Sequence, residues 1–309
     1  MEVKIEKVFQ NKIKSLKQSS FLIALSGGVD SMVLADLFIK NNLNFSVAHC
    51  NFKLRSTESD IDEDFIIKWS AKNGIKSYIT RFTTAEYCRK NKIGIQEGAR
   101  NLRYEWFNKL KDLYSFDYVV TAHHLDDQIE TYLINSMRGS GLTGLIGIPA
   151  KTNNLFRPLL EILKDEILIY SKLNKIDFRE DSSNSKNDYY RNMIRNVIIP
   201  EFKKFDDNVM LKFQTTLNNL NSTKIFADNV ISDIKNKIFI LDSSYLKVNI
   251  DDLKKLDPLE YYVHHLFIDF NFDFKEIIKL FNSDSGKHIN SNTHKLTKNK
   301  NLLIITEND

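Results

Sequence analysis

The chain has 309 residues, of which 42% are hydrophobic and 27% charged, and its formal net charge is +4. This composition is typical of a globular protein, and the length is enough for two domains. No stretch approaches the ~20 consecutive apolar residues of a membrane span, so we expect no contact with a membrane. Residues 1–18 carry acids and lysines without an apolar core, which predicts a cytoplasmic protein without a secretory signal.

Up to about residue 125, short apolar runs alternate with longer amphipathic segments, which predict strands and helices respectively. The predicted strands cover residues 21–26, 45–50, 77–82 and 118–123. The predicted helices between them cover residues 31–40, 60–73 and 94–114. This alternation indicates an α/β fold with a parallel sheet covered on both faces.

Beyond residue 149 glycine almost vanishes, and lysine, asparagine and isoleucine become more frequent. Segments 160–175 and 189–205 predict helices, and we expect Pro200 to interrupt the second one. We place the boundary between two domains near residue 205. The predicted domains are therefore residues 1–205 and a smaller, mainly helical domain of residues 206–309, which ends in an apolar run at 302–306.

The run FLIALSGGVDS, residues 21–31, breaks from an apolar strand into two adjacent glycines. Gly27 and Gly28 allow a sharp turn with bare backbone N–H groups, and Ser31 begins a helix. Bare amides at a helix N-terminus bind phosphate. The loop is neither a Walker A motif nor a G-x-G-x-x-G motif. A plain turn would explain the glycines, but not Asp30 and the flanking serines.

The second predicted strand ends in a histidine, and an acidic segment follows it. His49 and Asn51 at this strand end could contact a nucleotide, but a lone histidine there is more often structural, and we expect that of His49. The acids Asp60, Asp62, Glu63 and Asp64 are typical of a solvated first helical turn, where the helix dipole favours them.

The segment GIQEGARNLRYEWF, residues 94–107, places two arginines on one face of a helix. Arg100 and Arg103 lie three residues apart. By itself this pattern fits an amphipathic helix whose arginines extend over apolar surface. Two guanidinium groups near a phosphate loop also suit ATP or an RNA backbone.

The segment TAHHLDDQIETYLINSMRGSG, residues 121–141, carries the densest chemistry. His123 precedes three acids, Asp126, Asp127 and Glu130, that lie within one helical turn. Such acids repel one another unless they meet a cation, and either Mg²⁺ or a substrate ammonium group would serve. They also fit charge at a helix N-terminus. Adjacent histidines without a cysteine cluster argue against zinc.

The segment DYYRNMIRNVIIPEF places Arg191 and Arg195 four residues apart on one helix face, with Asn192 between them. Alone, the segment predicts a solvated face.

These motifs carry a family resemblance. SGGVDS resembles the pyrophosphate-binding loop (PP-loop) of the N-type ATP pyrophosphatases. Together with EGARNLRY, AHHLDDQIET, GSGLTGL and YYRNMIRNVIIP, in that order, it makes the chain similar to the tRNA(Ile)-lysidine synthetase family from about residue 20 to 202. Beyond residue 205 the match is weak, and the chain has space for one modest tRNA-binding module.

The resemblance implies a Rossmann-like PP-loop ATPase domain and a defined activity. The family converts the wobble cytidine of a CAU-anticodon tRNA(Ile) into lysidine. ATP adenylates the oxygen on carbon 2, pyrophosphate leaves, and the amine of free L-lysine then displaces AMP. The implied cofactors are ATP and Mg²⁺, the implied partners are that tRNA and lysine, and members of the family are often homodimers.

The resemblance also implies roles for individual residues. ATP would be held by Ser26, Gly27, Gly28, Val29, Asp30 and Ser31. The implied catalytic residues are Asp30, Asp127, Glu130, Arg100 and Arg191, with Asp30 and Asp127 as magnesium ligands. The implied substrate-binding residues are Arg103, His123, Asp126, Asn192 and Arg195. The acids of residues 126–130 fit both Mg²⁺ and the lysine ammonium group, and the sequence leaves the division open.

Three rival functions remain to be weighed. tRNA 2-thiolation needs thiol or iron–sulfur chemistry, and the two cysteines, Cys50 and Cys88, form no C-x-x-C pair, so we expect reduced thiols that only pack. A non-catalytic tRNA-binding protein would have lost acids or serines that are intact here. A small-molecule amidating ligase usually needs an ammonia source, and this sequence contains no glutaminase segment. A form that uses free ammonia would lack that segment too, so this rival stays open. The basic run at residues 286–300 fits either a flexible loop or a phosphate-binding patch.

Overall fold

The computed structural model describes residues 4–54, 57–179, 190–242 and 245–308. The chain divides into two compact units, Met1–Leu220 and Asn221–Asp309, and the division falls within the long helix α11 (Val209–Ile238). The boundary near residue 205 stays a prediction.

The first unit is built on a five-stranded sheet in the order β3-β2-β1-β4-β5, in which every neighbouring pair is parallel. The strands are β1 (Ser20–Ala24), β2 (Asn44–Asn51), β3 (Ser77–Arg81), β4 (Tyr118–Val120) and β5 (Leu155–Phe156). The predicted parallel α/β sheet is confirmed. The fifth strand has two residues, too few to give a periodic pattern.

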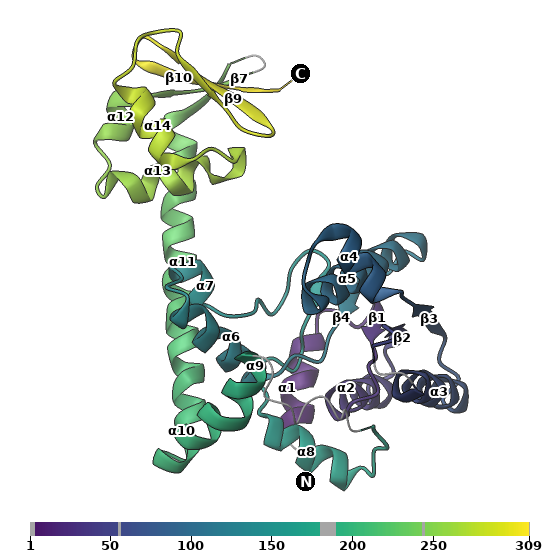
Figure 1. The fold of residues 1–309 in the computed structure, drawn as a ribbon. Helices are drawn as coiled ribbons and strands as arrows, with labels where there is room; N and C mark the ends of the chain where they lie inside the picture. The colour runs from purple at the N-terminus through teal and green to yellow at the C-terminus, as the bar shows by residue number, and fades with distance from the viewer. Residues whose placement is uncertain (1–3, 55–56, 180–189, 243–244, 309) are drawn as a thin grey trace. The chain divides into compact units, whose positions relative to one another are not determined.

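Helices cover both faces of this sheet, as Figure 1 shows. One face carries α4 (Thr84–Asn91) and α5 (Ile95–Leu113); the other carries α1 (Lys4–Ile13), α2 (Val29–Lys40), α3 (Thr57–Lys72) and α8 (Lys164–Leu173). Phe21 and Ile23 of β1 belong to the core with α1, α2 and α8, whereas Leu22 packs with Phe107 of α5. Burial on both faces explains why β1 reads as a continuous apolar run.

A second group of helices continues the first unit. It comprises α6 (Leu125–Met137), α7 (Leu142–Leu145), α9 (Tyr190–Met193), the π-helix η2 (Ile194–Ile198), α10 (Ile199–Phe205) and the start of α11. Leu125 and Ile129 of α6 share a small core with Ile194, Ile199 and Met210. This core fixes α6 against the segment that carries the arginine motif.

The expected interruption at Pro200 is wrong. The chain stays helical from Tyr190 to Phe205, and the N–H of Ile199 donates to the carbonyl of Ile194, five residues back. The wider π turn ends just before the proline, which then stands in the first turn of α10, where its missing N–H is tolerated.

Among the described residues, the second unit combines the C-terminal part of α11 and three further helices with an antiparallel sheet. The helices are α12 (Ile250–Lys254), α13 (Leu259–Phe267) with the 3₁₀ turn η3 (Ile268–Phe270), and α14 (Phe274–Phe281). The sheet order is β6-β7-β10-β9-β8, from β6 (Phe239–Asp242), β7 (Tyr245–Asn249), β8 (His288–Asn290), β9 (His294–Asn299) and β10 (Leu302–Glu307). The apolar run at 302–306 forms β10, and the five strands of this sheet add to the predicted helices. The basic run forms β8 and β9, so its interpretation as a flexible loop is wrong.

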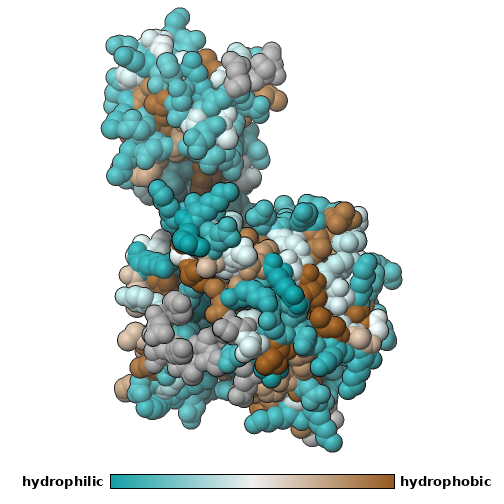
Figure 2. All heavy atoms as spheres, turned by 45° about the vertical axis from the view of Figure 1, so that its right-hand side comes forward, coloured by the Kyte–Doolittle hydropathy of each residue, from teal (hydrophilic) through white to brown (hydrophobic). Residues whose placement is uncertain are grey.

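Among the described residues, no helix is both long enough and apolar enough to cross a membrane. Hydrophilic side chains cover most of the face drawn in Figure 2, and hydrophobic residues are scattered between them.

Candidate active site

The loop between β1 and α2 is held in place by its own serines. Ser31 Oγ accepts from the backbone N–H of Ser26 (3.2 Å) and donates to the carbonyl of Gly28 (2.9 Å). The N–H of Gly28 in turn donates to Ser26 Oγ (3.3 Å). Gly27 has φ +89°, a left-handed conformation that disfavours a side chain, and Val29 is the first residue of α2. The sequence therefore builds a fixed loop at a helix N-terminus, which is an anion-binding geometry.

Behind the loop, a buried histidine contacts the backbone at the end of β1. His49 Nδ1 lies 2.8 Å from the carbonyl oxygen of Leu25, and His49 is 5% exposed. This contact joins the end of β2 to the start of the loop.

The expectation of solvated acids at the start of α3 is wrong for two of them. Asp62 and Glu63 are 7% and 4% exposed, respectively. Asp62 accepts from Arg179 Nε (3.1 Å), and the N–H of Arg179 donates to the carbonyl of Gly27 (2.9 Å). Hydrogen bonds from the Arg81 guanidinium lower the pKa of Glu63, although burial opposes them. The acids are buried because arginines distant in the sequence pair with them.

The acids of α6 meet the arginine motif. Glu130, whose side chain is 0% exposed, accepts from Arg191 Nε (Oε2, 2.6 Å) and from Arg195 Nε (Oε1, 2.6 Å). Asp127 Oδ1 lies 3.3 Å from the Arg191 NH2 nitrogen and 3.1 Å from that of Arg195. Asn192 is half-buried on the same turn. The structure thus brings together two motifs that are about sixty residues apart.

Asp127 stays ionised in this network. Burial alone would raise the pKa of Asp127, but the neighbouring His124 and Arg191 and a hydrogen bond from the backbone N–H of His124 (3.1 Å) lower it below its ordinary value. The two oxygens of Asp127 face different groups. Oδ1 faces the arginines, and Oδ2 faces His124.

His124 connects this network to the phosphate loop. Its Nε2 lies 3.5 Å from Asp127 Oδ2 and 3.9 Å from Asp30 Oδ2, and its Nδ1 lies 3.8 Å from Asp126 Oδ1. The residue is 4% exposed, and within the described part of the chain Nδ1 has no hydrogen-bond partner. Sequence reasoning did not assign His124 to the site, because only the fold surrounds it with three carboxylates.

The neighbouring His123 is neutral at neutral pH. Burial lowers the pKa of His123 to about 4, against an opposing effect of Asp127. Its Nδ1 lies 2.7 Å from Thr121 Oγ1.

Asp126 and Lys164 form the remaining side of the site. Asp126 Oδ1 accepts from the backbone N–H of Lys164 (2.9 Å), the first residue of α8, so one of its oxygens is engaged by that helix. The Lys164 ammonium group forms an ion pair with Asp30. Lys164 was missed by sequence reasoning, because its partner lies 134 residues away.

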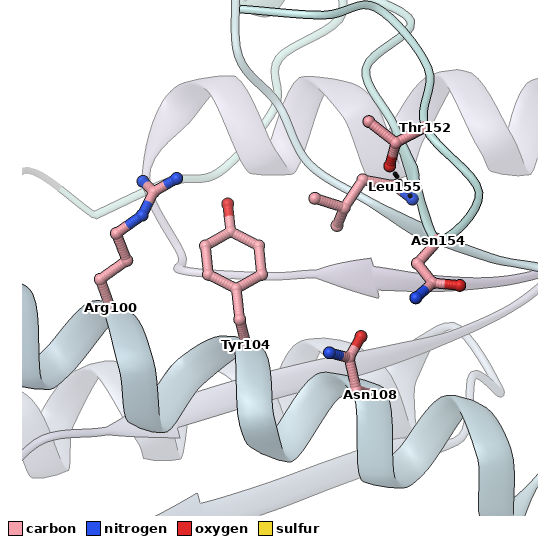
Figure 3. A pocket seen from close by; sticks show the side chains of 6 residues that line it. All are labelled: Arg100, Tyr104, Asn108, Thr152, Asn154 and Leu155. Carbon is pink, nitrogen blue, oxygen red and sulfur yellow. Dashed lines mark hydrogen bonds between the residues drawn. The ribbon is translucent and has the colours of Figure 1, made fainter. Parts of the chain in front are cut away.

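The arginines of α5 lie outside this network. Figure 3 shows Arg100, Tyr104 and Asn108 in a row along α5, on the side of the pocket opposite Thr152, Asn154 and Leu155. They line a pocket of about 300 Å³, and the Arg100 guanidinium lies 5.0 Å from the centre of the Tyr104 ring. Arg103 lies over the ring of Phe52 instead. Among the described residues, neither arginine takes part in the ion pairs of Asp127 and Glu130.

The carboxylates suit magnesium shared with phosphate. In the described ranges, no group of three or more histidine, cysteine, aspartate or glutamate side chains is placed to hold a metal ion by itself. Mg²⁺ commonly takes one or two carboxylates and completes its coordination with water and phosphate oxygens. Asp30 and Asp127 fit this pattern, because one oxygen of each lies within 4 Å of the same His124 nitrogen.

The fold and the loop define the class of the first unit. The family model of the PP-loop domain matches residues 1–202, and that of the TilS substrate binding domain matches residues 242–308. In fold, the chain resembles the U34-tRNA thiolase NcsA from Methanococcus maripaludis, solved with its 4Fe-4S cluster. The TM-score is 0.59 at 16% identity, over 70% of this chain and 78% of that one, so the likeness concerns the fold alone. The first unit is a PP-loop domain.

Relatives with high coverage specify the family. The chain is 34% identical over 290 residues to a tRNA(Ile)-lysidine synthase of Bacteroides thetaiotaomicron, covering 94% of this chain and 68% of that protein. It is 36% identical over 244 residues to that of Chlorobaculum tepidum (77% and 74%) and 32% identical over 288 residues to that of Porphyromonas gingivalis (92% and 63%). The chain belongs to the tRNA(Ile)-lysidine synthase family. It spans about two thirds of the length of these relatives.

Proposed function

We propose that this chain ligates free L-lysine onto carbon 2 of the wobble cytidine of a CAU-anticodon tRNA(Ile), using ATP. The C2 oxygen attacks the α-phosphorus, the bond to the bridging oxygen breaks, and pyrophosphate leaves with the electron pair. The lysine amine, in its neutral form, then attacks C2 and loses a proton to water, the C2–O bond breaks, and AMP leaves with the electron pair. The observation that carries this proposal is the carboxylate pair of the fully buried Glu130 and the half-buried Asp127, which lies beside the phosphate loop through His124.

The loop is the proposed site for the ATP phosphates. The amides around Gly27 and Gly28, together with Ser26 and Ser31, offer donors at the N-terminus of α2. Asp30 and Oδ2 of Asp127 are the proposed magnesium ligands. Mg²⁺ bound there would draw negative charge off the leaving pyrophosphate.

The other side of the acid pair is the proposed lysine site. Glu130 and Oδ1 of Asp127 are neutralised by two guanidinium groups, and a lysine ammonium group carries the same charge. Lysine can therefore replace Arg191 or Arg195, which then become available for a phosphate group of the adenylate or of the tRNA. Because the pKa of Asp127 is lowered, Asp127 is suited to bind a cation rather than to hold a proton.

The row of Arg100, Tyr104 and Asn108 is a proposed contact for the tRNA. A guanidinium, an aromatic ring and an amide in sequence along one helix can contact phosphate, stack on a base and bond to its edge. Arg103, His123 and Asn192 stay proposed substrate-binding residues. A homodimer and a cytoplasmic location stay predictions.

The deciding experiment is incorporation of labelled lysine into a CAU-anticodon tRNA(Ile) transcript, with ATP and magnesium. The controls omit ATP or substitute a methionine tRNA. Incorporation confined to the complete reaction is the expected result. Release of AMP and pyrophosphate without incorporation would support the adenylation step and would show that lysine is not the nucleophile. Binding of the tRNA without any ATP cleavage would favour a non-catalytic tRNA-binding protein.

Thiolation is the alternative in the same class of fold. It requires a reactive thiol or a cluster, and a reactive thiol is a thiolate. Burial raises the pKa of Cys50 to about 12, and Cys88 is 4% exposed, so both thiols are protonated or enclosed. This observation favours lysidine formation.

A further inference from the structure

Two helices on the same face of the first sheet run parallel in matched register. Three contacts join α2 to α8 along their length, and the partners in each are 134 residues apart. The contacts are Lys164 with Asp30, Tyr170 Oη with Asp36 Oδ2 (2.8 Å), and Lys40 Nζ with Asn174 Oδ1 (2.6 Å). A constant offset requires both helices to point the same way. Their N-termini therefore lie side by side, at the end where the phosphate loop enters α2.

Lys164 is the first residue of α8, so this register delivers its ammonium group to the phosphate loop. The backbone of Lys164 is fixed as well, because its N–H donates to Asp126. The side chains of Lys164 and Asp30 are 31% and 30% exposed, and an ion pair so open to water contributes little to stability. The small contribution of this ion pair to the stability of the fold therefore does not account for a lysine at this position.

The loop itself contains no cation. In Walker A loops a lysine within the motif reaches the β- and γ-phosphates. Here the stretch from Ser26 to Ser31 supplies amides and hydroxyls but also a negative charge, Asp30, at a site for a polyanion. A triphosphate bound there requires positive charge, and Lys164 lies in direct contact with the loop's own acid.

We propose that Lys164 is the phosphate-binding lysine of this site, supplied by α8 instead of by the loop. Its ammonium group binds the β- and γ-phosphate oxygens of ATP and stabilises the pyrophosphate, which carries the electron pair of the broken bond as it leaves. Without nucleotide, Asp30 holds Lys164 in place. This inference rests on the proposed use of ATP and extends it to a residue outside the loop.

The test is nucleotide binding to the full chain without tRNA or lysine, by equilibrium dialysis with labelled ATP, pyrophosphate or AMP in the presence of magnesium. We expect Lys164→Gln to weaken ATP and pyrophosphate binding at least tenfold and to leave AMP binding within twofold of wild type. Lys164→Arg keeps the charge and should recover most of the affinity. In lysine incorporation, Lys164→Gln should raise the KM for ATP and leave the KM for lysine unchanged.

Lys40→Gln is the matched control, because Lys40 joins the same two helices at their far ends. It should lower the melting temperature about as much as Lys164→Gln and bind ATP normally. ATP and pyrophosphate affinities of Lys164→Gln equal to wild type would overturn the proposal, as would an equal loss of AMP binding. Wild-type protein that binds no ATP would instead reject the proposed function itself, and the role of Lys164 with it.

Discussion

Glu130 and Arg195 form an ion pair whose acidic partner is completely enclosed. Arg195 Nε lies 2.6 Å from Glu130 Oε1, and no part of the Glu130 side chain is exposed. Arg191 occupies the other oxygen at the same distance. A buried charge is tolerated only when it is paired and hydrogen-bonded. The pair therefore fixes the acids that we propose as the lysine site, and it ties α6 to the π-helix.

The first prediction concerns the acids and arginines of this network. Asp127→Asn and Arg191→Ala should each lower lysine incorporation by more than about 100-fold, because each removes a charge that the reaction uses. Circular dichroism and the melting temperature should show folded protein. Asp165→Asn, an exposed acid of α8, is the control and should keep full activity. Near-normal incorporation by either variant would remove that residue from the mechanism.

The second prediction concerns acid stability and His123. The pKa of His123 is about 4 in the folded chain, against an ordinary value of 6.5, so the unfolded chain binds the proton first. Stability should therefore fall as the pH decreases from about 6.5 toward 4. His123→Gln should remove this part of the loss. The pKa of Asp127 is lowered from its ordinary value of 3.8, so the stability that Asp127 contributes is lost only at lower pH, outside this window.

This dependence can be measured by urea unfolding at pH 7, 5.5 and 4.5. Both tryptophans of the chain, Trp69 and Trp106, lie in the first unit, so their fluorescence reports that unit. The free energy of unfolding should fall more steeply with decreasing pH for wild type than for His123→Gln. The difference between the two slopes should reach up to about 1.4 kcal/mol per pH unit. His288→Gln, on the second unit, is the control and should match wild type. Equal slopes for wild type and His123→Gln would contradict the prediction.

The third prediction concerns Gly98 in α5. A Cβ added there would overlap the Cys88 sulfur of α4, so the two helices approach as closely as glycine permits. Gly98→Ala should lower the free energy of unfolding by about 1–3 kcal/mol from overpacking, in spite of the helix propensity that alanine adds. Cys88→Ala in the same chain should recover part of the loss. A Gly98→Ala variant as stable as wild type would show that the helices separate at little cost.

The fourth prediction separates lysidine formation from thiolation. Cys50→Ala and Cys88→Ala should each leave lysine incorporation within about twofold of wild type, because the proposed chemistry uses neither the half-buried Cys50 thiol nor the buried Cys88 thiol. The assay is the same labelled-lysine reaction, with a parallel assay for sulfur transfer. Loss of incorporation in folded Cys50→Ala protein would bring thiol chemistry back into consideration.

The phosphate loop was predictable because its parts are contiguous. Two glycines, two serines and the start of a helix follow one another, and local geometry alone determines what they build. The acids of α6 were predictable as a cluster for the same reason. Their arginine partners were predicted as a second motif, but their contact with Glu130 depends on the packing of α6 against η2.

Other features depended on contacts across the fold. The sequence predicts Asp62 and Glu63 to be solvated acids at the start of a helix. Nothing near them in the sequence shows that Arg179 and Arg81 pair with them in the fold. Lys164 is one of many lysines, and only the register of two parallel helices distinguishes it. The short strands of the second unit pack through few residues each and give weak periodicity.

The last prediction concerns the basic run, which folds as the β8–β9 hairpin. Leu296 faces the core of the second unit, and its neighbour Lys295 is exposed, as is Lys287. Lys298 differs, because its ammonium group donates to two carbonyls at the end of α14. If the hairpin binds the tRNA backbone, the exposed lysines are the ones that release counterions. The variant to test is therefore Lys287→Gln with Lys295→Gln, and Lys298 is left intact.

The measurement is tRNA affinity at a series of salt concentrations. The double variant should bind more weakly at low salt, and its slope of log K against log salt should be shallower by about 1.5, the effect of two lost phosphate contacts. The control is Lys255→Gln with Lys279→Gln, two exposed lysines of the same unit that are already paired with Asp252 and Glu276. It should keep the wild-type slope, because those charges are neutralised within the chain. A slope unchanged by the hairpin variant would show that the tRNA backbone does not contact these two lysines.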